Sequence, residues 1–472
     1  MRKIVELEGK RLLVVGLART GVVVSLFCAV YGAHVTAIDE KPEAALREAA
    51  ERLRAAGVAL HFGEVEPETF TNQDLIILSP GVPAKLPGLE AARSRNIPVW
   101  SEIELAWRLL RGKLVAITGS NGKTTTTALV AHILQSAKIP VLVGGNIGTP
   151  LLARVEASSD SSVTVAEVSS FQLETIEAFR PDIGVLLNLT PDHLDRHGSF
   201  EEYARAKQRI FENMIDRDFA VLNADDQQVA QRGPAHGHVY WFSRQKRLAA
   251  GTFLRGDEIL FRREGTESVL MRRGDIPLRG EHNLENVLAA ATAAILAGAP
   301  TDAIGAAVRT FPGVEHRLEF VAQIGGVDFY NDSKATNVDA ALKAIEAFPG
   351  SLIVILGGKD KGAPYEPLRE PLRQKAKFAL LIGASAEKIA GELQGAVEMQ
   401  HAGTLERALN IALEKAQAGD TVLLAPACAS FDQYENFEQR GREFKEIVAR
   451  LASKNAAESA AENAAENPVR KG

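Results

Sequence analysis

The stretch that decides the fold is Leu114–Thr125, LVAITGSNGKTT, an apolar run that leads directly into a glycine-rich loop and a polar helix start. The run Leu114–Ile117 predicts a short buried strand, and the residues after Lys123 predict a helix. A glycine-rich turn at such a junction lets backbone N–H groups surround phosphate oxygens at the positive end of the helix. The loop therefore predicts a nucleotide phosphate site at Gly119, Asn121, Gly122, Lys123, Thr124 and Thr125.

Two side chains of this loop have predicted roles in phosphate chemistry. Lys123 would reach the β- and γ-phosphates, and the Thr124 hydroxyl would bind Mg²⁺. The loop is shorter than the common GxxxxGK[ST] pattern, because Ile117 stands five residues before Gly122 and Gly119 stands three before it. The alternative is a plain strand-to-helix turn with an exposed lysine.

Two residues farther along the chain are predicted to lie beside this loop. Glu167 ends an expected strand at Val163–Val168, and His193 follows another at Ile183–Leu189. In open parallel sheets the carboxyl ends of the strands border the ligand crevice. A carboxylate and an imidazole there would bind a divalent ion next to the phosphates.

Lys207 occupies an unusual position in its predicted helix. The helix is expected from Phe200 to about Ile215, with Ser199 as its N-cap. Lys207 lies four residues after Tyr203 and three before Ile210, on the apolar face. A lysine on that face must extend its amine to solvent, pair with another group or be chemically modified.

The N-terminal part alternates strand signals, beginning with the apolar run Arg11–Val15, with helix signals, which predicts βαβ units and a parallel sheet. Farther along the chain, the Ala-rich stretch Glu281–Ala297 predicts a helix. The loop GLARTG at residues 16–21 matches GxGxxG except at Ala18, and Asp39 ends the next strand. The middle glycine normally allows close approach to a dinucleotide pyrophosphate, and an acidic residue there takes a ribose hydroxyl. An NAD site, another nucleotide site and tight strand–helix packing all stay open.

The C-terminal part shows a second alternating pattern. Phe320–Ile324 and Val327–Tyr330, joined by two glycines, predict a hairpin. Leu352–Leu356, Phe378–Ile382 and Val422–Leu424 predict buried parallel strands separated by helices. After them, the repeat AAESAAENAAEN places like charges at i, i+4 spacing, so we expect a frayed or disordered tail.

Composition limits the class of protein. The chain has 472 residues, is 46% hydrophobic and 24% charged, and carries a net charge of −6. These values predict a globular protein of about three domains and exclude a disordered chain. The acidic balance argues against a nucleic-acid polymer as partner. With two cysteines, charges in the N-terminal segment and apolar runs below the roughly 20 residues of a bilayer span, we expect a cytoplasmic protein without a membrane partner.

The motifs together resemble one family, the Mur ligases, from about residue 10 to about residue 450. The shortened phosphate loop is typical of Mur ligases and of the related folylpolyglutamate synthases. NDSKATN and PACASFDQ resemble the D-glutamate-adding members. The segments that carry the resemblance are GSNGKTT (119–125), GGNIGTP (144–150), EVSSFQLE (167–174), PDHLDRH (191–197), GEHNLEN (280–286), EHR (315–317), NDSKATN (331–337), LGGKDKG (356–362) and PACASFDQYENFEQRG (426–441).

The resemblance implies an α/β protein of three domains. A Rossmann-like N-terminal domain (1–110) would bind the UDP part of the substrate. A central P-loop ATPase domain with a mostly parallel sheet (111–312) would bind ATP and magnesium. A Rossmann-like C-terminal domain (313–451) would bind D-glutamate, and residues 452–472 form a low-complexity tail. The family also implies a monomer.

The resemblance also implies roles for single residues. The catalytic residues would be Lys123, Lys207, His193 and Arg317. ATP would contact the phosphate loop together with Asn286, Arg317 and Asp332. Two Mg²⁺ ions would be bound by Thr124, Glu167, His193 and Lys207, the last as a carbamylated lysine. UDP-N-acetylmuramoyl-L-alanine would contact Thr20, Asp39, Gly81, Asn146 and His193. D-Glutamate would contact Lys334, Thr336, Lys361, Ser430 and Phe431.

The implied activity is ATP-dependent addition of D-glutamate to UDP-N-acetylmuramoyl-L-alanine through an acyl phosphate, in peptidoglycan precursor synthesis. Another Mur ligase or a folylpolyglutamate synthase is the nearest alternative. A P-loop ATPase that performs conformational work and an NAD-dependent dehydrogenase are alternatives from other classes. Ala425 departs from the family pattern, because many relatives have serine there, and the tail lies outside that pattern.

Overall fold

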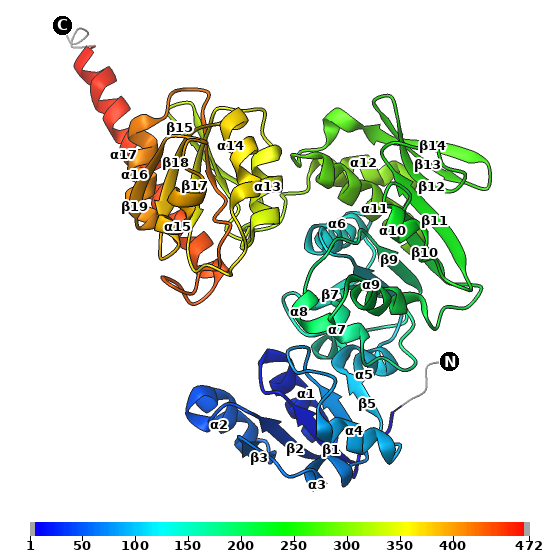
Figure 1. Ribbon diagram of the computed structural model, residues 1–472. Helices are drawn as coiled ribbons and strands as arrows, with labels where there is room; N and C mark the ends of the chain where they lie inside the picture. Colours follow the sequence, from blue (N-terminus) through cyan, green and yellow to red (C-terminus); the bar gives the residue numbers. More distant parts are fainter. Residues whose placement is uncertain (1–4, 467–472) are drawn as a thin grey trace, which may run out of the picture. The chain divides into compact units, whose positions relative to one another are not determined.

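The computed structural model describes residues 5–466, without the side chains of Asp195 and of residues 457–466. The chain forms two compact units (Figure 1). Unit 1 contains Met1–Pro277 and His282–Phe311, and unit 2 contains Leu278–Glu281 and Pro312–Gly472. The predicted domain boundaries near residues 111 and 313 stay predictions.

The first sheet of unit 1 has five parallel strands in the order β3-β2-β1-β4-β5. Its first strand is the predicted run RLLVV, whose apolar side chains are buried on both faces. Leu12 and Val14 join one core cluster, and Leu13 and Val15 join another. The elements are β1 (Arg11–Val15), α1 (Arg19–Val30), β2 (His34–Asp39), α2 (Arg47–Ala55), β3 (Ala59–Phe62), α3 (Glu68–Thr71), β4 (Leu75–Leu78), α4 (Pro87–Ser94) and β5 (Val99–Ser101).

The second sheet of unit 1 has nine strands in the order β14-β13-β12-β11-β10-β9-β6-β8-β7. The pairs from β7 to β12 are parallel, and β12, β13 and β14 are antiparallel. The strands are β6 (Lys113–Thr118), β7 (Val141–Gly145), β8 (Val163–Glu167), β9 (Ile183–Leu186), β10 (Phe219–Asn223), β11 (His238–Ser243), β12 (Gly251–Arg255), β13 (Glu258–Arg263) and β14 (Thr266–Arg272). Because β6 lies between β8 and β9, the loop after it leaves from an interior strand of the sheet.

The helices of this part confirm most of the sequence predictions, with one helix shorter than expected. The predicted helix from Phe200 to about Ile215 ends as an α-helix at Gln208 and continues only as a 3-10 turn over Arg209–Phe211. Arg209 donates hydrogen bonds to the backbone carbonyls of residues 173, 174 and 176, which holds the chain where the helix ends. The helices are α5 (Glu102–Leu109), α6 (Lys123–Ser136), α7 (Ser170–Leu173), α8 (Leu194–His197), α9 (Phe200–Gln208), α10 (Gln227–Ala230), α11 (Glu281–Ala297) and α12 (Thr301–Arg309).

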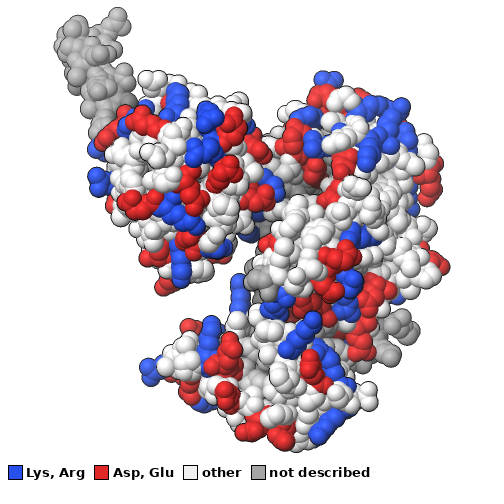
Figure 2. Space-filling model, in the orientation of Figure 1, with Lys and Arg blue, Asp and Glu red and all other residues white. Residues whose placement is uncertain are grey.

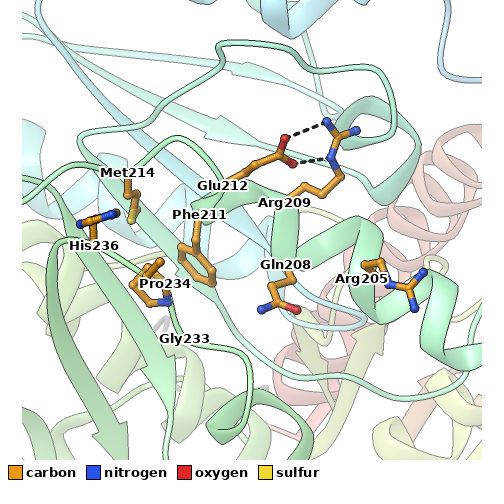
Figure 3. Close-up of a pocket in the computed structure, with 10 residues that line it drawn as sticks. Arg205, Gln208, Arg209, Phe211, Glu212, Met214, Gly233, Pro234 and His236 are labelled. Carbon is orange, nitrogen blue, oxygen red and sulfur yellow. Dashed lines mark hydrogen bonds and ion pairs between the residues drawn. The ribbon is translucent and has the colours of Figure 1, made fainter.

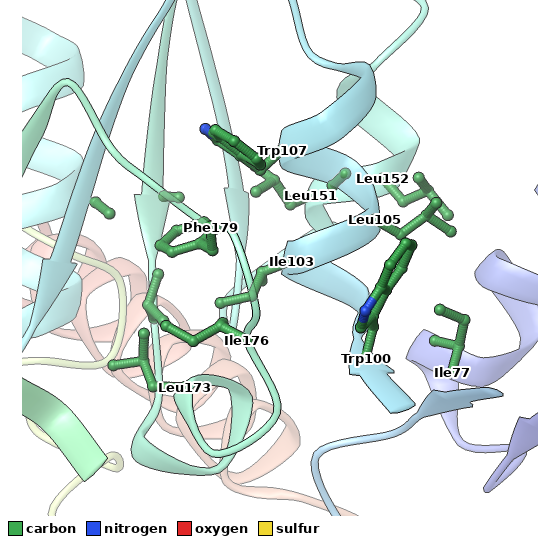
Figure 4. Close-up of a cluster of buried hydrophobic side chains, with 14 of the residues drawn as sticks. Ile77, Trp100, Ile103, Leu105, Trp107, Leu151, Leu152, Leu173, Ile176 and Phe179 are labelled. Atoms are coloured by element: carbon green, nitrogen blue, oxygen red, sulfur yellow. The ribbon is translucent and has the colours of Figure 1, made fainter. Parts of the chain in front are cut away.

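Helix α5 joins the two sheets of unit 1 through a buried carboxylate. Glu104 accepts hydrogen bonds from the backbone N–H groups of Glu177, Ala178 and Phe179, and from Nε of Arg108. Around it, Ile103, Trp107, Ile176 and Phe179 belong to one apolar cluster that spans both sheets (Figure 4). Hydrogen bonds to an ionised group are stronger than neutral ones, so this carboxylate fixes α5 to the second sheet.

Unit 2 is built on a six-stranded sheet in the order β15-β16-β20-β17-β18-β19. The predicted hairpin forms an antiparallel edge, and all other pairs are parallel. Helices cover both faces: one core cluster contains side chains of α13, α14 and α15, and another contains side chains of α16 and α17 (Figure 1). The elements are β15 (Glu319–Ile324), β16 (Val327–Asn331), α13 (Val338–Glu346), β17 (Leu352–Gly357), α14 (Arg369–Lys375), β18 (Ala376–Ile382), α15 (Ala386–Glu392), β19 (Met399–Gly403), α16 (Leu405–Lys415), β20 (Thr421–Leu424) and α17 (Phe437–Glu466).

The expectation of a frayed or disordered tail is wrong for the backbone up to Glu466. Helix α17 continues through the alanine-rich repeat to that residue. Alanine has the highest helix propensity, and repulsion between like charges four residues apart costs only a few tenths of a kcal/mol. Residues 467–472 lie outside the part of the chain that the structure describes.

The three sheets confirm the predicted α/β class. Within residues 5–466, no helix has both the length and the apolar character needed to cross a membrane. On the face drawn in Figure 2, basic and acidic side chains are interspersed over both units. This mixture fits the small net charge of the chain.

Candidate functional site

The glycine-rich loop turns directly from β6 into α6, as its sequence predicts. Gly122 precedes the helix in the left-handed conformation, with φ of 84°. A Cβ atom on Gly122 would lie 2.2 Å from Oδ1 of Asn286. Both this clash and the left-handed backbone exclude a larger residue there. The backbone N–H of Asn121 donates to Oδ1 of Asn188 at 2.8 Å. Asn286, a predicted ATP contact, thus lies against the phosphate loop.

Two lysines meet at one backbone carbonyl of this loop. Nζ of Lys123 donates to the oxygens of Gly119 and Ser120, both at 2.8 Å. Nζ of Lys207 donates to the same Gly119 oxygen at 2.9 Å. The amines therefore converge on the loop predicted to hold the phosphates, although Lys207 lies 84 positions after Lys123 in the chain.

Lys207 is buried on the apolar face of α9, as the periodicity predicts. The residue is 2% exposed, and its amine lies 4.8 Å from the ring centroid of Tyr203. Burial lowers the pKa of Lys207 well below its ordinary value, and the charge of Lys123 lowers it further. An amine in this environment favours its neutral form, which is nucleophilic.

Oxygen donors suited to magnesium gather at the carboxyl end of β8. The Thr124 hydroxyl donates to Oε2 of Glu167 at 2.9 Å, and Nδ2 of Asn146 donates to Oε1 at 2.9 Å. Glu167 is 2% exposed. A hydroxyl and a carboxylate beside a phosphate loop fit Mg²⁺, which is usually bound by one or two protein groups together with phosphate oxygens. Thr124 and Glu167 are therefore the residues that would hold the ion.

His193 lies in the predicted loop after β9 but is not part of this cluster. Its backbone is left-handed, with φ of 51°, and its half-exposed ring lies 5.0 Å from the ring of Phe171. Among the residues whose side chains are described, no group of three or more His, Cys, Asp or Glu residues is arranged to hold a metal ion. The proposed metal role of His193 remains a prediction.

The N-terminal loop shows the tight strand–helix packing that its sequence left open. Asp39 accepts the backbone N–H of Leu17 at 2.7 Å and that of Lys41 at 2.9 Å. A Cβ atom on Gly21 would lie 1.8 Å from the carbonyl oxygen of Gly16. Asp39 thus orders the loop beside Thr20, and the loop from Ser79 to Gly81 adjoins it, because Ser79 Oγ donates to the Gly16 oxygen at 2.8 Å.

Unit 2 brings Arg317 and Asp332 together. The neighbours of Arg317, His316 and Leu318, are both left-handed, with φ of 63° and 43°. Burial raises the pKa of Asp332 to about 7, and the charge of Arg317 opposes that rise. Backbone strain of this kind persists where the surroundings impose it and often occurs at functional sites. Ala427, next to the predicted D-glutamate loop, is also left-handed, with φ of 58°.

The predicted D-glutamate residues lie on three loops at the carboxyl ends of strands in unit 2. Lys334 and Thr336 follow β16, Lys361 follows β17, and Ser430 and Phe431 follow β20. The second and third loops are joined by backbone hydrogen bonds in both directions between Lys359 and Ala429, at 2.8 and 3.1 Å. Ser430 is buried, whereas Phe431 is 65% exposed.

Sequence reasoning missed Arg440, which ties two of these loops together. Its Nε donates to the Ser333 hydroxyl at 3.0 Å, and its Nη2 donates to the Ser333 carbonyl at 2.8 Å. Both Nη atoms also donate to the carbonyl of Cys428 at 3.3 Å. The signal was present: Arg440 lies four residues before Phe444 and seven before Ile447, on the apolar side of its helix.

A second missed group is the buried pair Tyr365 and Cys428. The Tyr365 hydroxyl lies 3.0 Å from Sγ of Cys428 and donates to Oδ1 of Asp360 at 2.9 Å. It therefore links the loop of Lys361 to the loop of Ser430. No local sequence pattern could reveal this contact, because its members are up to 68 positions apart.

One pocket of about 400 Å³ lies away from these residues (Figure 3). It is lined by Arg205, Gln208, Arg209, Phe211, Glu212, Met214 and residues 233–236. Arg209 and Glu212 pair with each other at 2.6 Å. None of the predicted site residues lines this pocket, so the candidate site consists of the loops and not of this cavity.

Three family models match the chain. The model for the Mur ligase MurD-like N-terminal domain matches residues 10–101. The Mur ligase middle domain matches residues 117–294, and the Mur ligase glutamate ligase domain matches residues 316–428.

Curated relatives match nearly the full length. The UDP-N-acetylmuramoylalanine–D-glutamate ligase of Koribacter versatilis is 52% identical over 95% of this chain and 99% of its own. The enzyme of the same name from Solibacter usitatus is 53% identical over 95% of this chain and 100% of its own. Among solved structures, UDP-N-acetylmuramate-alanine ligase from Thermotoga maritima matches with a TM-score of 0.58 at 20% identity, over 93% of this chain and 99% of its own.

Proposed function

This chain belongs to the Mur ligase family, and on that premise we propose that it joins D-glutamate to UDP-N-acetylmuramoyl-L-alanine, with conversion of ATP to ADP and phosphate. The choice of D-glutamate as the amino acid rests on one observation: 95% of the chain matches relatives named as D-glutamate ligases. The N-terminal match to the MurD-like model agrees with it. The NAD-dependent alternative has no support from these relatives, and the packing of the N-terminal loop explains its glycines without a dinucleotide.

In the first step, the terminal carboxylate of UDP-N-acetylmuramoyl-L-alanine attacks the γ-phosphorus of ATP. An O–P bond forms, the bond to the β-phosphate oxygen breaks, and ADP leaves. A carboxylate is a poor acyl donor, and the acyl phosphate that forms has a good leaving group. Two anions must approach each other, so positive charge at the phosphates is the main requirement. Lys123 and Arg317 are the proposed sources of it.

In the second step, the neutral amine of D-glutamate attacks the acyl carbon. A C–N bond forms through a tetrahedral intermediate, the C–O bond to phosphate breaks, and the amine loses a proton. Both carboxylates of D-glutamate require partners. Lys334 and Lys361 would supply charge, and Thr336 and Ser430 would supply hydroxyl groups. Phe431, exposed at the same loop, would contact the aliphatic part of the amino acid.

Magnesium, bound by Thr124 and Glu167, would neutralise charge on the phosphates. We further propose that Lys207 carries a carbamate. Its neutral amine would attack CO₂: an N–C bond forms, one C=O π bond of CO₂ opens to an oxyanion, and nitrogen releases one proton. The neutral amine would thus become a carbamate anion suited to binding metal. The pairing of Lys207 and Lys123 on one carbonyl supports this, because it disfavours two adjacent cations. His193 and Asn146 would contact the sugar–peptide part. We expect a cytoplasmic monomer.

The decisive experiment measures release of phosphate from ATP with each substrate alone and in combination. We expect turnover only with UDP-N-acetylmuramoyl-L-alanine and D-glutamate together, and mass spectrometry should find the corresponding amide. L-Alanine with UDP-N-acetylmuramic acid, and diaminopimelate with the dipeptide precursor, are the matched controls. Turnover without any amino acid would favour the ATPase alternative, and turnover with one of the control pairs would favour another ligase of this family.

A further inference from the structure

Three side chains of unit 1 form a series of polar contacts, called the relay below, that the proposed mechanism does not use. The Ser170 hydroxyl lies 3.0 Å from Nε2 of His197, and Nδ1 of His197 lies 3.1 Å from Oε1 of Glu174. Ser170 follows the strand that carries Glu167, and His197 ends the short helix that follows His193. The relay therefore joins the two loops predicted to meet at the phosphates.

The roles of the two imidazole nitrogens follow from their partners. The Glu174 carboxylate lies 3.1 Å from Nδ1, and because a carboxylate accepts and does not donate, it favours the tautomer with the proton on Nδ1. Nε2 of the neutral ring then accepts from the Ser170 hydroxyl. The His197 side chain is 3% exposed and that of Glu174 is 21% exposed. A buried imidazole with a partner at each nitrogen is held in one orientation.

The same order of side chains occurs in serine hydrolases, where the serine attacks a substrate. Here Ser170 is 2% exposed. Its hydroxyl is therefore inaccessible to a substrate carbonyl, which leaves orientation as the role of the relay.

The His197 ring supports an aromatic and cationic stack. It stacks on Phe171, with 5.2 Å between the ring centroids and 10° between the planes. The Arg196 guanidinium lies over the same phenyl ring, 4.5 Å from its centroid. The ring of His193 approaches it as well, at 5.0 Å. Because Phe171 contacts all three side chains, a change in the position of His197 would also shift Arg196 and His193.

Arg196 extends this chain of contacts to the first sheet. It donates from Nη1 to the carbonyl oxygen of Gly81 at 3.1 Å and from Nη2 to that of Val82 at 2.5 Å. These carbonyls belong to the loop after β4, and the family resemblance implies that Gly81 of this loop contacts the nucleotide-sugar substrate. The guanidinium fork suits two adjacent carbonyls.

We propose that His197 is a positioning residue: through Ser170, Glu174 and Phe171 it orients Arg196 toward the carbonyls of Gly81 and Val82, and so sets the affinity for the nucleotide-sugar substrate. The proposal rests on the proposed function for the identity of that substrate. It assigns His197 no contact with the reacting atoms. Its effect should therefore appear in the binding of the nucleotide sugar, while the use of ATP changes little.

The test compares three variants of His197 with the wild-type chain. His197→Leu removes the hydrogen bond to Ser170 and the contact with Glu174. His197→Asn retains a donor at the position of Nδ1, and His197→Gln retains a polar group at the position of Nε2. His132→Leu is the matched control, because His132 also pairs with a hydroxyl, that of Thr310 at 3.2 Å, and packs beside a phenyl ring, that of Phe311 at 5.5 Å.

The measured quantities are KM for each substrate and Kd for UDP-N-acetylmuramoyl-L-alanine from calorimetry without ATP. For His197→Leu we expect KM and Kd for the nucleotide sugar to rise about tenfold, as for the loss of buried hydrogen bonds, and KM for ATP to stay within about twofold. Asn and Gln should each give a partial rise, of about threefold. If His197→Leu does not fold, the Asn and Gln variants carry the test alone.

Two outcomes would overturn the proposal. One is an unchanged Kd in all three variants, and the other is an equal rise in KM for ATP and for the nucleotide sugar, which a general loss of structure predicts. A wild-type chain that binds the nucleotide sugar but forms no amide would contradict the proposed function and leave the Kd comparison in force. A wild-type chain that does not bind it would contradict both.

Discussion

Two buried basic residues, one in each unit, differ in the hydrogen-bond acceptors around them. Lys207 is 2% exposed, and its close hydrogen bond is to the Gly119 carbonyl, an oxygen that it shares with Lys123. Arg440 is 1% exposed and donates to the Ser333 hydroxyl, the Ser333 carbonyl and the Cys428 carbonyl. Burial lowers both pKa values, that of Lys207 well below its ordinary value and that of Arg440 only to about 10.

We expect this difference to separate a reactive group, Lys207, from a structural one, Arg440. Arg440 keeps its proton near neutral pH, and its planar fork fits several carbonyl oxygens at once. Lysine loses its proton more readily when it is buried, and the neutral amine is then a nucleophile. Burial of charge is therefore not by itself a sign of catalysis; the number and type of the partners decide the role.

The largest effect should come from removing the reactive cation. We expect Lys207→Ala to lower turnover about 10³-fold, because the group proposed to bind metal at the phosphates is lost. A small carboxylic acid such as acetate, added to the assay, should partly restore turnover by supplying the missing carboxylate. Arg205→Ala, on the exposed face of the same helix, is the control. Full activity of Lys207→Ala would refute both the proposed carbamate and the contrast between a reactive Lys207 and a structural Arg440.

The second effect concerns the structural cation. Arg440→Lys keeps the charge but cannot reproduce the fork, so we expect the apparent Tm to fall by on the order of 5 °C, as for a loss of about 2 kcal/mol. Arg442→Lys, at an exposed position of the same helix, should melt like the wild-type chain. Differential scanning calorimetry measures both. Equal melting of the two variants would mean that the hydrogen bonds of Arg440 contribute no net stability.

The smallest effect tests the charge state of Lys207 through pH. A lowered pKa means that the folded chain binds fewer protons than the unfolded one, from that lowered pKa up to about 10.4. The stability contributed by Lys207 therefore rises with pH across this window. In CO₂-free buffer, Lys207→Met should be more stable than the wild-type chain by on the order of 1–3 kcal/mol at pH 7. Urea unfolding should show this gain shrinking as the pH approaches 10; a constant gain would contradict the prediction.

Much of the fold follows from the sequence because its central strands are short, apolar and ended by glycine or polar residues. The run at Arg11–Val15 forms β1 with the predicted bounds, and the helix at Glu281–Ala297 is α11 as predicted. The prediction missed β3 and β7, whose side chains are only partly buried. A half-buried strand at a sheet edge lacks the apolar run that marks the central strands.

The candidate site could be predicted where local patterns carry the chemistry. The glycine-rich loop is recognised by its motif between an apolar strand and a helix, and helical periodicity places Lys207 on a buried face. His197 was missed because its partners Ser170 and Glu174 lie 27 and 23 positions away, and only the fold joins them. The same holds for Tyr365 and Cys428. Arg440 is different, because helical spacing would have placed it on the buried side of α17.

Glu104 binds the main chain of residues 177–179 and not their side chains, so its hydrogen bonds do not depend on which side chains stand there. The family-model matches end at residue 101 and resume at residue 117, on either side of α5. We therefore expect the exchange point for an N-terminal module, in evolution and in engineering, to lie just before this helix. A foreign nucleotide-binding module joined at that point would be followed by α5, and so by the hydrogen bonds of Glu104 to residues 177–179. The first 101 residues could then change in sequence while the predicted site loops of the second sheet stay in place.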